Sequence, residues 1–128
     1  MKEAEIEALV GQLQGRREIK FAILYGSAAE GNDYNDLDVA LYVDPEQVSG
    51  LDELRYGFRI EDELRQAVAH PVDVRVINWA PLPFQFNVIK GIPLVVNDEE
   101  AYFAFREQTW DNYLDFEPVA RAYLREML

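Results

Sequence analysis

The sequence contains no cysteine and only half as many positive as negative side chains. Its 128 residues include 12 Lys and Arg, 24 Asp and Glu and one His, for a formal net charge of −12. The absence of cysteine excludes disulfides, zinc–thiolate centres and thiol nucleophiles. The shortage of positive charge argues against direct binding of nucleic acid, because Lys and Arg neutralise the phosphate backbone. The excess of acid is typical of an acidic partner for a basic protein, and equally of a protein kept soluble by its charge.

Long apolar runs are also missing. No run approaches the roughly 20 residues that span a bilayer, and the first five residues lack the pattern of a signal peptide. We therefore expect no membrane association and a cytoplasmic location. A length of 128 residues is enough for one hydrophobic core, so we expect a single domain over residues 1–128.

Apolar periodicity and turn residues predict alternating helices and strands. The predicted elements are a helix over 3–14, a strand over 20–25 followed by a short helix, a turn over 32–35, a strand over 37–43, a helix from a capping box at 49–52 to about 68, a strand over 71–77, a helix over 84–90, a strand over 92–96, a helix after 98 and a last helical segment from 118 through 128.

Helical spacing groups apolar residues on one side of two predicted helices. In the helix that ends near residue 68, the expected buried stripe comprises Leu51, Leu54, Phe58, Leu64 and Val68. In the helix that Asp98 caps, Tyr102, Phe105, Thr109 and Tyr113 align on one side. The C-terminal third carries more aromatic residues than one helical face can bury, so either some of them face a partner or all join the core.

A turn of small residues follows the strand over 20–25. Gly26 and Ser27 place backbone N–H groups and a hydroxyl where phosphate oxygens could approach closely. Such a turn is suited to binding a nucleotide or another phosphate compound.

Carboxylates gather around the next strand. Asp36 and Asp38 share one strand face because alternate side chains point the same way. Asp73 joins that face if its strand pairs beside the first with its valines toward the core. Three carboxylates could then hold two divalent metal ions such as Mg²⁺. Taken singly, Asp36 could cap a turn and Asp73 could pair with Arg75.

At these residues the sequence resembles the minimal nucleotidyltransferases of the DNA polymerase beta superfamily, and more closely the antitoxins of HEPN/MNT toxin–antitoxin systems. The resemblance is carried by Gly26-Ser27-x-Ala29-x-Gly31, by Asp36-x-Asp38, by the later strand residue Asp73, and by the segments 91–95 and 113–116. It implies an α/β (α+β) nucleotidyltransferase-like fold, with a small mixed sheet flanked by helices and a helical C-terminus.

Two positions depart from the pattern of that family. Asn35 stands where Ser is usual, and it keeps a polar group able to bind a turn or a phosphate. Glu30 stands where Arg is usual and reverses a charge. If Glu30 faces a triphosphate, its carboxylate repels the phosphates. If Glu30 instead lies in the first turn of a short helix and faces water, the helix dipole stabilises its negative charge.

The resemblance implies a Mg²⁺-dependent adenylyltransferase antitoxin that transfers AMP from ATP to a tyrosine of a HEPN ribonuclease toxin and neutralises it. Asp36, Asp38 and Asp73 would be the catalytic residues and the ligands of two Mg²⁺ ions. Gly26, Ser27 and Asn35 would bind ATP. The expected partners are the HEPN toxin, in a hetero-complex, and ATP, with a homo-oligomer also open. Two alternatives are a catalytically inactive antitoxin that acts by binding alone, and nucleotidyl transfer to a small molecule.

Overall fold

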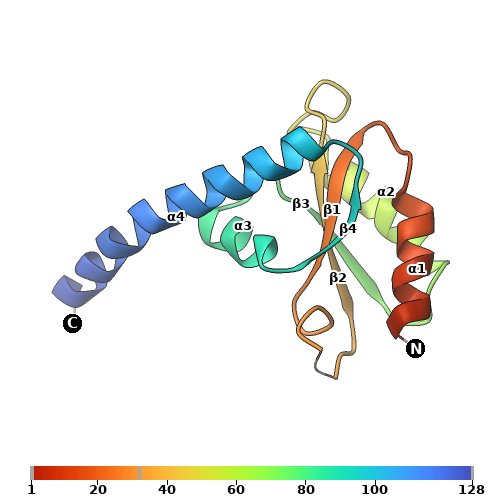
Figure 1. Cartoon of the computed structure of the whole chain (residues 1–128), viewed down its shortest axis with the longest axis horizontal. Coiled ribbons are helices and arrows are strands. Elements are labelled where there is room, and N and C mark those ends of the chain that lie inside the picture. The colour runs from red at the N-terminus through yellow and green to blue at the C-terminus, as the bar shows by residue number, and fades with distance from the viewer. Residues whose placement is uncertain (1, 32, 128) are drawn as a thin grey trace.

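The computed structural model describes residues 2–31 and 33–127. In chain order the described elements are α1 (Lys2–Leu13), β1 (Ile19–Tyr25), β2 (Leu37–Val43), α2 (Glu53–Arg65), β3 (Val72–Val76), α3 (Leu82–Ile89), β4 (Ile92–Val96) and α4 (Glu99–Met127) (Figure 1). Strands β2 and β4 match the predicted ranges, and the other strands and α1 and α3 differ from theirs by a few residues at most. The predicted turn over 32–35 begins at Asn32, which lies outside the described residues.

The strands form one mixed sheet in the order β3-β2-β1-β4. Strand β1 pairs antiparallel with β2 and β4, whereas β2 pairs parallel with β3. The register places Asp38 of β2 opposite Tyr25 on one side and opposite Asp73 on the other. The predicted pairing of the two aspartate-bearing strands is therefore confirmed.

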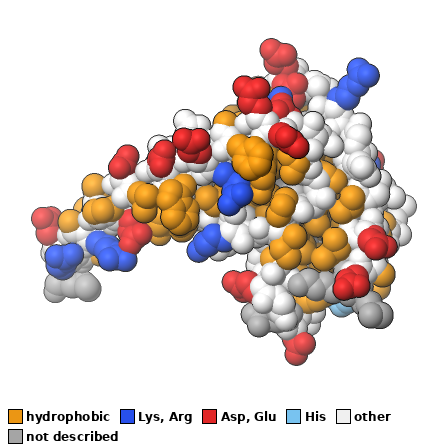
Figure 2. Space-filling view, in the orientation of Figure 1, with side chains coloured by type: hydrophobic (Ala, Val, Ile, Leu, Met, Phe, Trp, Pro, Cys, Tyr) orange, Lys and Arg blue, Asp and Glu red, His pale blue; other side chains and the backbone are white. Residues whose placement is uncertain are grey.

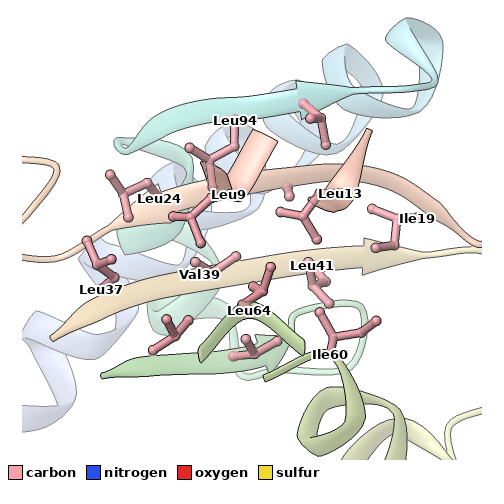
Figure 3. Close-up of a cluster of buried hydrophobic side chains, with 14 of the residues drawn as sticks. Leu9, Leu13, Ile19, Leu24, Leu37, Val39, Leu41, Ile60, Leu64 and Leu94 are labelled. Carbon is pink, nitrogen blue, oxygen red and sulfur yellow. The ribbon is translucent and has the colours of Figure 1, made fainter. Parts of the chain in front are cut away.

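Helices cover both faces of the sheet, with α1 and α2 on one face and α3 and α4 on the other (Figure 1). The alternation of β2 divides its side chains between two cores. Leu37, Val39, Leu41 and Val43 pack in the core under α1 and α2, which includes Leu9, Leu13, Ile60 and Leu64 (Figure 3). Ala40 and Tyr42 pack under α3 and α4. Asp38 belongs to this second face, at the end of the strand that the β1 turn approaches.

Helix α2 buries only part of the predicted stripe. Leu64 is buried as predicted, together with Tyr56 and Ile60, whereas Leu51, Leu54 and Phe58 are 98%, 70% and 61% exposed. The helix also ends at Arg65, before Val68. The predicted capping box at 49–52 does not form. The Ser49 hydroxyl instead donates to the Asp52 carboxylate at 3.0 Å, and the Asp52 side chain makes no capping hydrogen bond.

The neighbouring strand determines which face of α2 is buried. A Cβ added at Gly57 would lie 3.6 Å from the Val74 carbonyl oxygen, so the helix approaches β3 closely at this point. One turn further on, the buried Glu61 carboxylate accepts a 3.0 Å hydrogen bond from the Val74 N–H. Gly57 and Glu61 therefore lie against β3, whereas Leu54 and Phe58, on the adjoining side of the helix, lie beyond the edge of the sheet and outside the core.

Helix α4 begins as predicted but does not break at Pro118. Asp98 Oδ1 accepts a 3.0 Å hydrogen bond from the Ala101 N–H, and Tyr102, Phe105 and Thr109 are buried. Pro118 lies inside one continuous helix, in the part that projects from the body of the protein (Figure 1). Proline removes the bond that its N–H would give to the carbonyl four residues earlier, and on this exposed segment water can hydrate that carbonyl. The predicted end of the helix, Leu128, lies outside the described residues.

The projecting part of α4 exposes many of its large side chains. Figure 2 shows hydrophobic side chains along this part of the helix. Exposed members of the C-terminal third include Phe103, Trp110, Phe116 and Tyr123. Of the two predicted alternatives, the one in which every aromatic residue joins the core is therefore wrong. Although α4 has 29 residues, no helix in the described ranges is both long and apolar enough to cross a membrane.

Candidate active site

Gly26 directly follows β1, and its backbone lies close to the Asp38 carboxylate. Its φ is +76°, a conformation that side chains other than glycine rarely adopt. A Cβ at this position would lie 2.5 Å from Asp38 Oδ2. The backbone conformation therefore requires glycine, and the Asp38 carboxylate occupies the space beside it, so the turn and the carboxylate form one site.

Residues 26–31 form a turn and not the predicted short helix. The N–H groups of Ala29 and Glu30 both donate to the Gly26 carbonyl, at 3.1 and 3.2 Å. The preceding N–H groups, those of Ser27 and Ala28, donate to no backbone carbonyl within the described residues. Ala28 is fully buried, so of these two amides only that of the half-buried Ser27 remains available to an anion beside the turn.

Asp38 is partly buried at the centre of the site. Burial first, and then the negative charges of Asp73 and Asp36, raise the pKa of Asp38 above its usual value, while Arg75 partly offsets them. The three carboxylates repel one another, and a bound cation would relieve this repulsion.

Asp73 lies beside Asp38 on the adjacent strand and has one basic neighbour. Its Oδ2 is 3.6 Å from Nε of Arg75, and both side chains are substantially exposed. The Arg75 guanidinium also lies over the Phe84 ring, 5.6 Å from its centroid. The ion pair that the sequence left open thus exists, but it is long and solvated, which limits how far it neutralises Asp73.

The remaining predicted site residues lie around this centre. Asp36 is exposed just before β2 and contributes to the field at Asp38. Ser27 is half-buried in the turn, and Asn35 is exposed in the bend before β2. The structure therefore brings Gly26, Asp38 and Asp73 together directly and places Asp36, Ser27 and Asn35 at their edge.

Tyr25 is a buried site residue that the sequence analysis missed. Its ring meets the Phe84 ring edge-on, with centroids 5.5 Å apart. Burial, followed by the charges of Asp38 and Asp73, raises the pKa of the Tyr25 hydroxyl, so Tyr25 is neutral here. In the sequence, the one sign that Tyr25 lies in the site is its position directly before Gly26.

Glu30 and Lys90 line one small cavity beside the turn. A cavity of about 90 Å³ is lined by Gly26, Glu30, Lys90 and four other residues. Glu30 is exposed, and its position beside Gly26 is close to any anion bound at the turn. Lys90 was also missed, and it supplies a positive charge to the same cavity.

No three His, Asp or Glu side chains within residues 2–31 and 33–127 converge tightly enough to bind a metal ion on their own. The oxygen donors of Asp38, Asp73 and Asp36 nevertheless suit Mg²⁺, which is usually held by one or two carboxylates together with substrate phosphates. The Gly26 turn lies directly beside Asp38.

A small mixed sheet with a glycine turn closed onto a carboxylate-bearing strand defines a nucleotidyltransferase domain. The family model for polymerase beta nucleotidyltransferases matches residues 7–100, which include the turn, Asp36, Asp38 and Asp73. The chain therefore belongs to the polymerase beta nucleotidyltransferase family.

Solved structures with the same fold come from toxin–antitoxin complexes. A chain from the complex of a tri-AMPylated Shewanella oneidensis HEPN toxin with an MNT antitoxin matches with a TM-score of 0.73 at 16% identity, covering 99% of this chain and 98% of that one. A chain of the toxin–antitoxin pair MntA–HepT matches with a TM-score of 0.73 at 15% identity, covering 98% and 97%. A chain of a toxin–antitoxin structure with AMP-PNP matches with a TM-score of 0.70 at 16% identity, covering 95% and 97%. No curated protein matches by sequence. At these identities the likeness shows the fold.

Proposed function

We propose that this protein is a Mg²⁺-dependent adenylyltransferase that transfers AMP from ATP to a tyrosine hydroxyl of a HEPN-domain toxin and thereby acts as its antitoxin. The observation that carries the proposal is the closure of the Gly26 turn onto Asp38, with Asp73 in register beside it. The tri-AMPylated HEPN toxin and the AMP-PNP complex among the similar structures support the choice of partner and nucleotide.

Each part of the site has a distinct role in this reaction. The Ser27 amide and hydroxyl would hold phosphate oxygens of ATP. Asp36, Asp38 and Asp73 would hold Mg²⁺, with two ions expected, and the metal would neutralise charge on the phosphates. Asn35 donates a hydrogen bond at the phosphate edge. ATP, once bound, places its α-phosphorus near Asp38.

The transfer is an in-line displacement at the α-phosphorus. The tyrosine oxygen forms a new bond to phosphorus as the bond to the bridging oxygen of the β-phosphate breaks, and pyrophosphate leaves toward the Gly26 turn. Asp73 accepts the proton of the tyrosine hydroxyl and passes it to water. Catalysis rests on positioning and on charge neutralisation, because no covalent bond to the protein is needed.

An inactive antitoxin that works by binding alone is favoured by one observation. Glu30 lines the cavity beside the turn, where a carboxylate opposes a bound triphosphate. Lys90 in the same cavity offsets this charge, and the three carboxylates expected of an active site are all present. We therefore place the active enzyme first. Transfer to a small molecule has no such observation in its favour.

Intact-mass spectrometry tests the proposal. The chain is incubated with ATP, Mg²⁺ and a HEPN-domain protein from the same genome, with an Asp36→Asn, Asp38→Asn double variant as control. We expect the HEPN protein to gain one or more AMP units only with the unaltered chain. A stable complex without any mass gain would instead establish the antitoxin that binds without catalysis.

A further inference from the structure

A large apolar cavity lies around the outer edge of β3. Its volume is about 530 Å³, and its walls come from α2, from β3 and from the segment that leads into α3. Leu54 and Phe58 of α2 line it, together with Trp79 and Phe84 from the stretch around the start of α3. The volume is within the range of about 300–1,000 Å³ that is usual for binding sites.

The apolar side chains of this cavity are not core residues. Leu54, Phe58 and Trp79 are 70%, 61% and 45% exposed, although all three are large and hydrophobic. Single exposed apolar residues are ordinary, but here residues from separate elements face one cavity. Leu54 and Phe58 are four residues apart on α2, so they present a continuous surface to an occupant.

The cavity and the candidate active site share Asp73. Asp73 lines the cavity and also lies in register with Asp38 on the neighbouring strand. Arg75 lines the cavity as well, and its guanidinium connects Asp73 with the Phe84 ring. An occupant of the cavity therefore reaches the reacting centre without crossing the sheet.

The order of the strands determines the side from which an acceptor enters. If the proposed function is correct, pyrophosphate leaves toward the Gly26 turn at the end of β1, and the α-phosphorus lies near Asp38 on β2. An in-line nucleophile must approach from the opposite side, over β3, because the attacking and leaving oxygens lie on opposite sides of phosphorus. This is the side on which Asp73 and the cavity lie.

The edge of β3 does not offer a free backbone to a pairing strand. The Val74 N–H donates to the Glu61 carboxylate at 3.0 Å, and the Val72 carbonyl accepts from Arg65 Nε at 3.1 Å. Glu61 and Arg65 also pair with each other, at 3.3 Å. Because these side chains occupy the edge, an occupant binds through its side chains and not by adding a strand to the sheet.

We propose that this cavity, which we name the acceptor cavity, binds the tyrosine-bearing segment of the toxin and delivers its hydroxyl to Asp73. The inference rests on the proposed function and adds the residues that select the acceptor. Leu54, Phe58 and Trp79 bind the apolar side chains that flank the tyrosine, and Phe84 and Arg75 border its ring. The step itself is unchanged: oxygen bonds to the α-phosphorus, pyrophosphate departs and the proton goes to Asp73.

Substitutions in α2 test the acceptor cavity. We compare Leu54→Ser and the double variant Leu54→Ser, Phe58→Ser with Leu51→Ser, because Leu51 is 98% exposed and lies outside the cavity. All these side chains are exposed, so we expect each variant to fold, which thermal unfolding checks. We expect the double variant to lose at least about tenfold in kcat/KM for the toxin, as for removal of interface anchors. Leu51→Ser should match the unaltered chain.

Two further measurements distinguish other occupants. Calorimetric titration with ATP and Mg²⁺ should give the same affinity for all variants, whereas a loss in the cavity variants would assign the cavity to the adenine ring and overturn the inference. Size-exclusion chromatography of the chain alone should also be unchanged, and a shift would assign the cavity to a second copy. Undiminished transfer by the double variant would overturn the acceptor cavity alone, whereas no transfer by the unaltered chain would overturn the proposed function.

Discussion

Gly26 shows how a single residue can set the geometry of a site. Its positive φ turns the chain at the end of β1, and its missing side chain leaves room for the Asp38 carboxylate. Asp38, in turn, is partly buried among like charges, and burial first and then these charges raise its pKa. Gly26 and Asp38 are thus both structurally constrained and needed by the proposed reaction, and substitution should separate their structural roles from their chemical ones.

We predict that Gly26→Ala destabilises the chain more than Gly15→Ala does. Gly15 also has a positive φ, +80°, but a Cβ there meets no atom within 4 Å. The control should therefore lose only the backbone term of about 1–2 kcal/mol, whereas Gly26→Ala also displaces the Asp38 carboxylate from its rotamer, which costs about 0.5–1.5 kcal/mol more. Denaturant unfolding measures both losses. Equal losses would show that the turn can move away from Asp38.

A second prediction concerns the charge at Asp38. Asp38→Asn keeps the shape of the side chain and removes both the cost of burying a charge and the repulsion with Asp73 and Asp36, so the ligand-free variant should melt at a higher temperature while losing AMP transfer. A raised carboxyl pKa means that the ionised form opposes folding. The advantage of the variant should therefore be present at neutral pH and shrink as pH falls and Asp38 takes up a proton. A variant that melts lower at neutral pH would give Asp38 a structural role.

At the scale of elements, one carboxylate joins helix α1 to both loops that lead into the aspartate-bearing strands. Glu5 accepts a 3.0 Å hydrogen bond from the Tyr34 hydroxyl before β2, and its other oxygen lies 2.6 Å from Nδ1 of His70 before β3. The His70 side chain is thereby engaged away from the active site. Burial favours protonated Glu5, but the hydrogen bonds with His70 and Tyr34 together outweigh it and lower the pKa of Glu5.

We predict that Glu5→Gln lowers the free energy of unfolding by about 1 kcal/mol at neutral pH. A lowered carboxyl pKa contributes stability above the ordinary Glu pKa, and this stability is lost as pH falls through the pKa of the folded state. The difference between the variant and the unaltered chain should therefore shrink in acid. Urea unfolding across a pH series measures it, with Glu7→Gln on the exposed side of α1 as control. A difference that stays constant with pH would contradict this assignment.

At the scale of the whole molecule, the net charge of −12 opposes every anionic ligand, ATP included. Fields from distant charges are screened by salt, whereas Glu30 lies beside the turn where phosphates would bind. The total charge and the single local charge therefore act over different distances, and a matched pair of substitutions can distinguish them.

We predict that Glu30→Arg raises ATP affinity by about threefold to tenfold, on the order of 1 kcal/mol for a partly solvated pair. Glu7→Arg changes the net charge equally but lies on α1, outside the site, so it should change affinity little at physiological salt. Calorimetry with ATP and Mg²⁺ measures both variants. The same gain in both would show that only the total charge matters, and no gain in either would place Glu30 outside the phosphate site.

Local patterns determined much of the fold. The range and the two faces of β2 follow from strict alternation, and the Asp98 cap and the buried side of α4 follow from helical spacing, so these were predictable from neighbouring residues alone. The turn at Gly26 was predictable for the same reason. The pairing of Asp38 with Asp73 needed one further assumption, that the two strands are adjacent, and the sheet confirms it.

Other features depended on contacts between distant segments. Helix α2 has apolar residues on more than one side, so its sequence could not show which side is buried. That side was decided by β3, through the close approach at Gly57 and the bond from Val74 to Glu61. Leu54 and Phe58 were consequently left at the acceptor cavity, and Glu30 and Lys90, 60 positions apart, came to share one small cavity. The sequence by itself determined the chemistry of the site and the strands that carry it, because alternation and turn formation are local, whereas only tertiary packing decided what surrounds that chemistry.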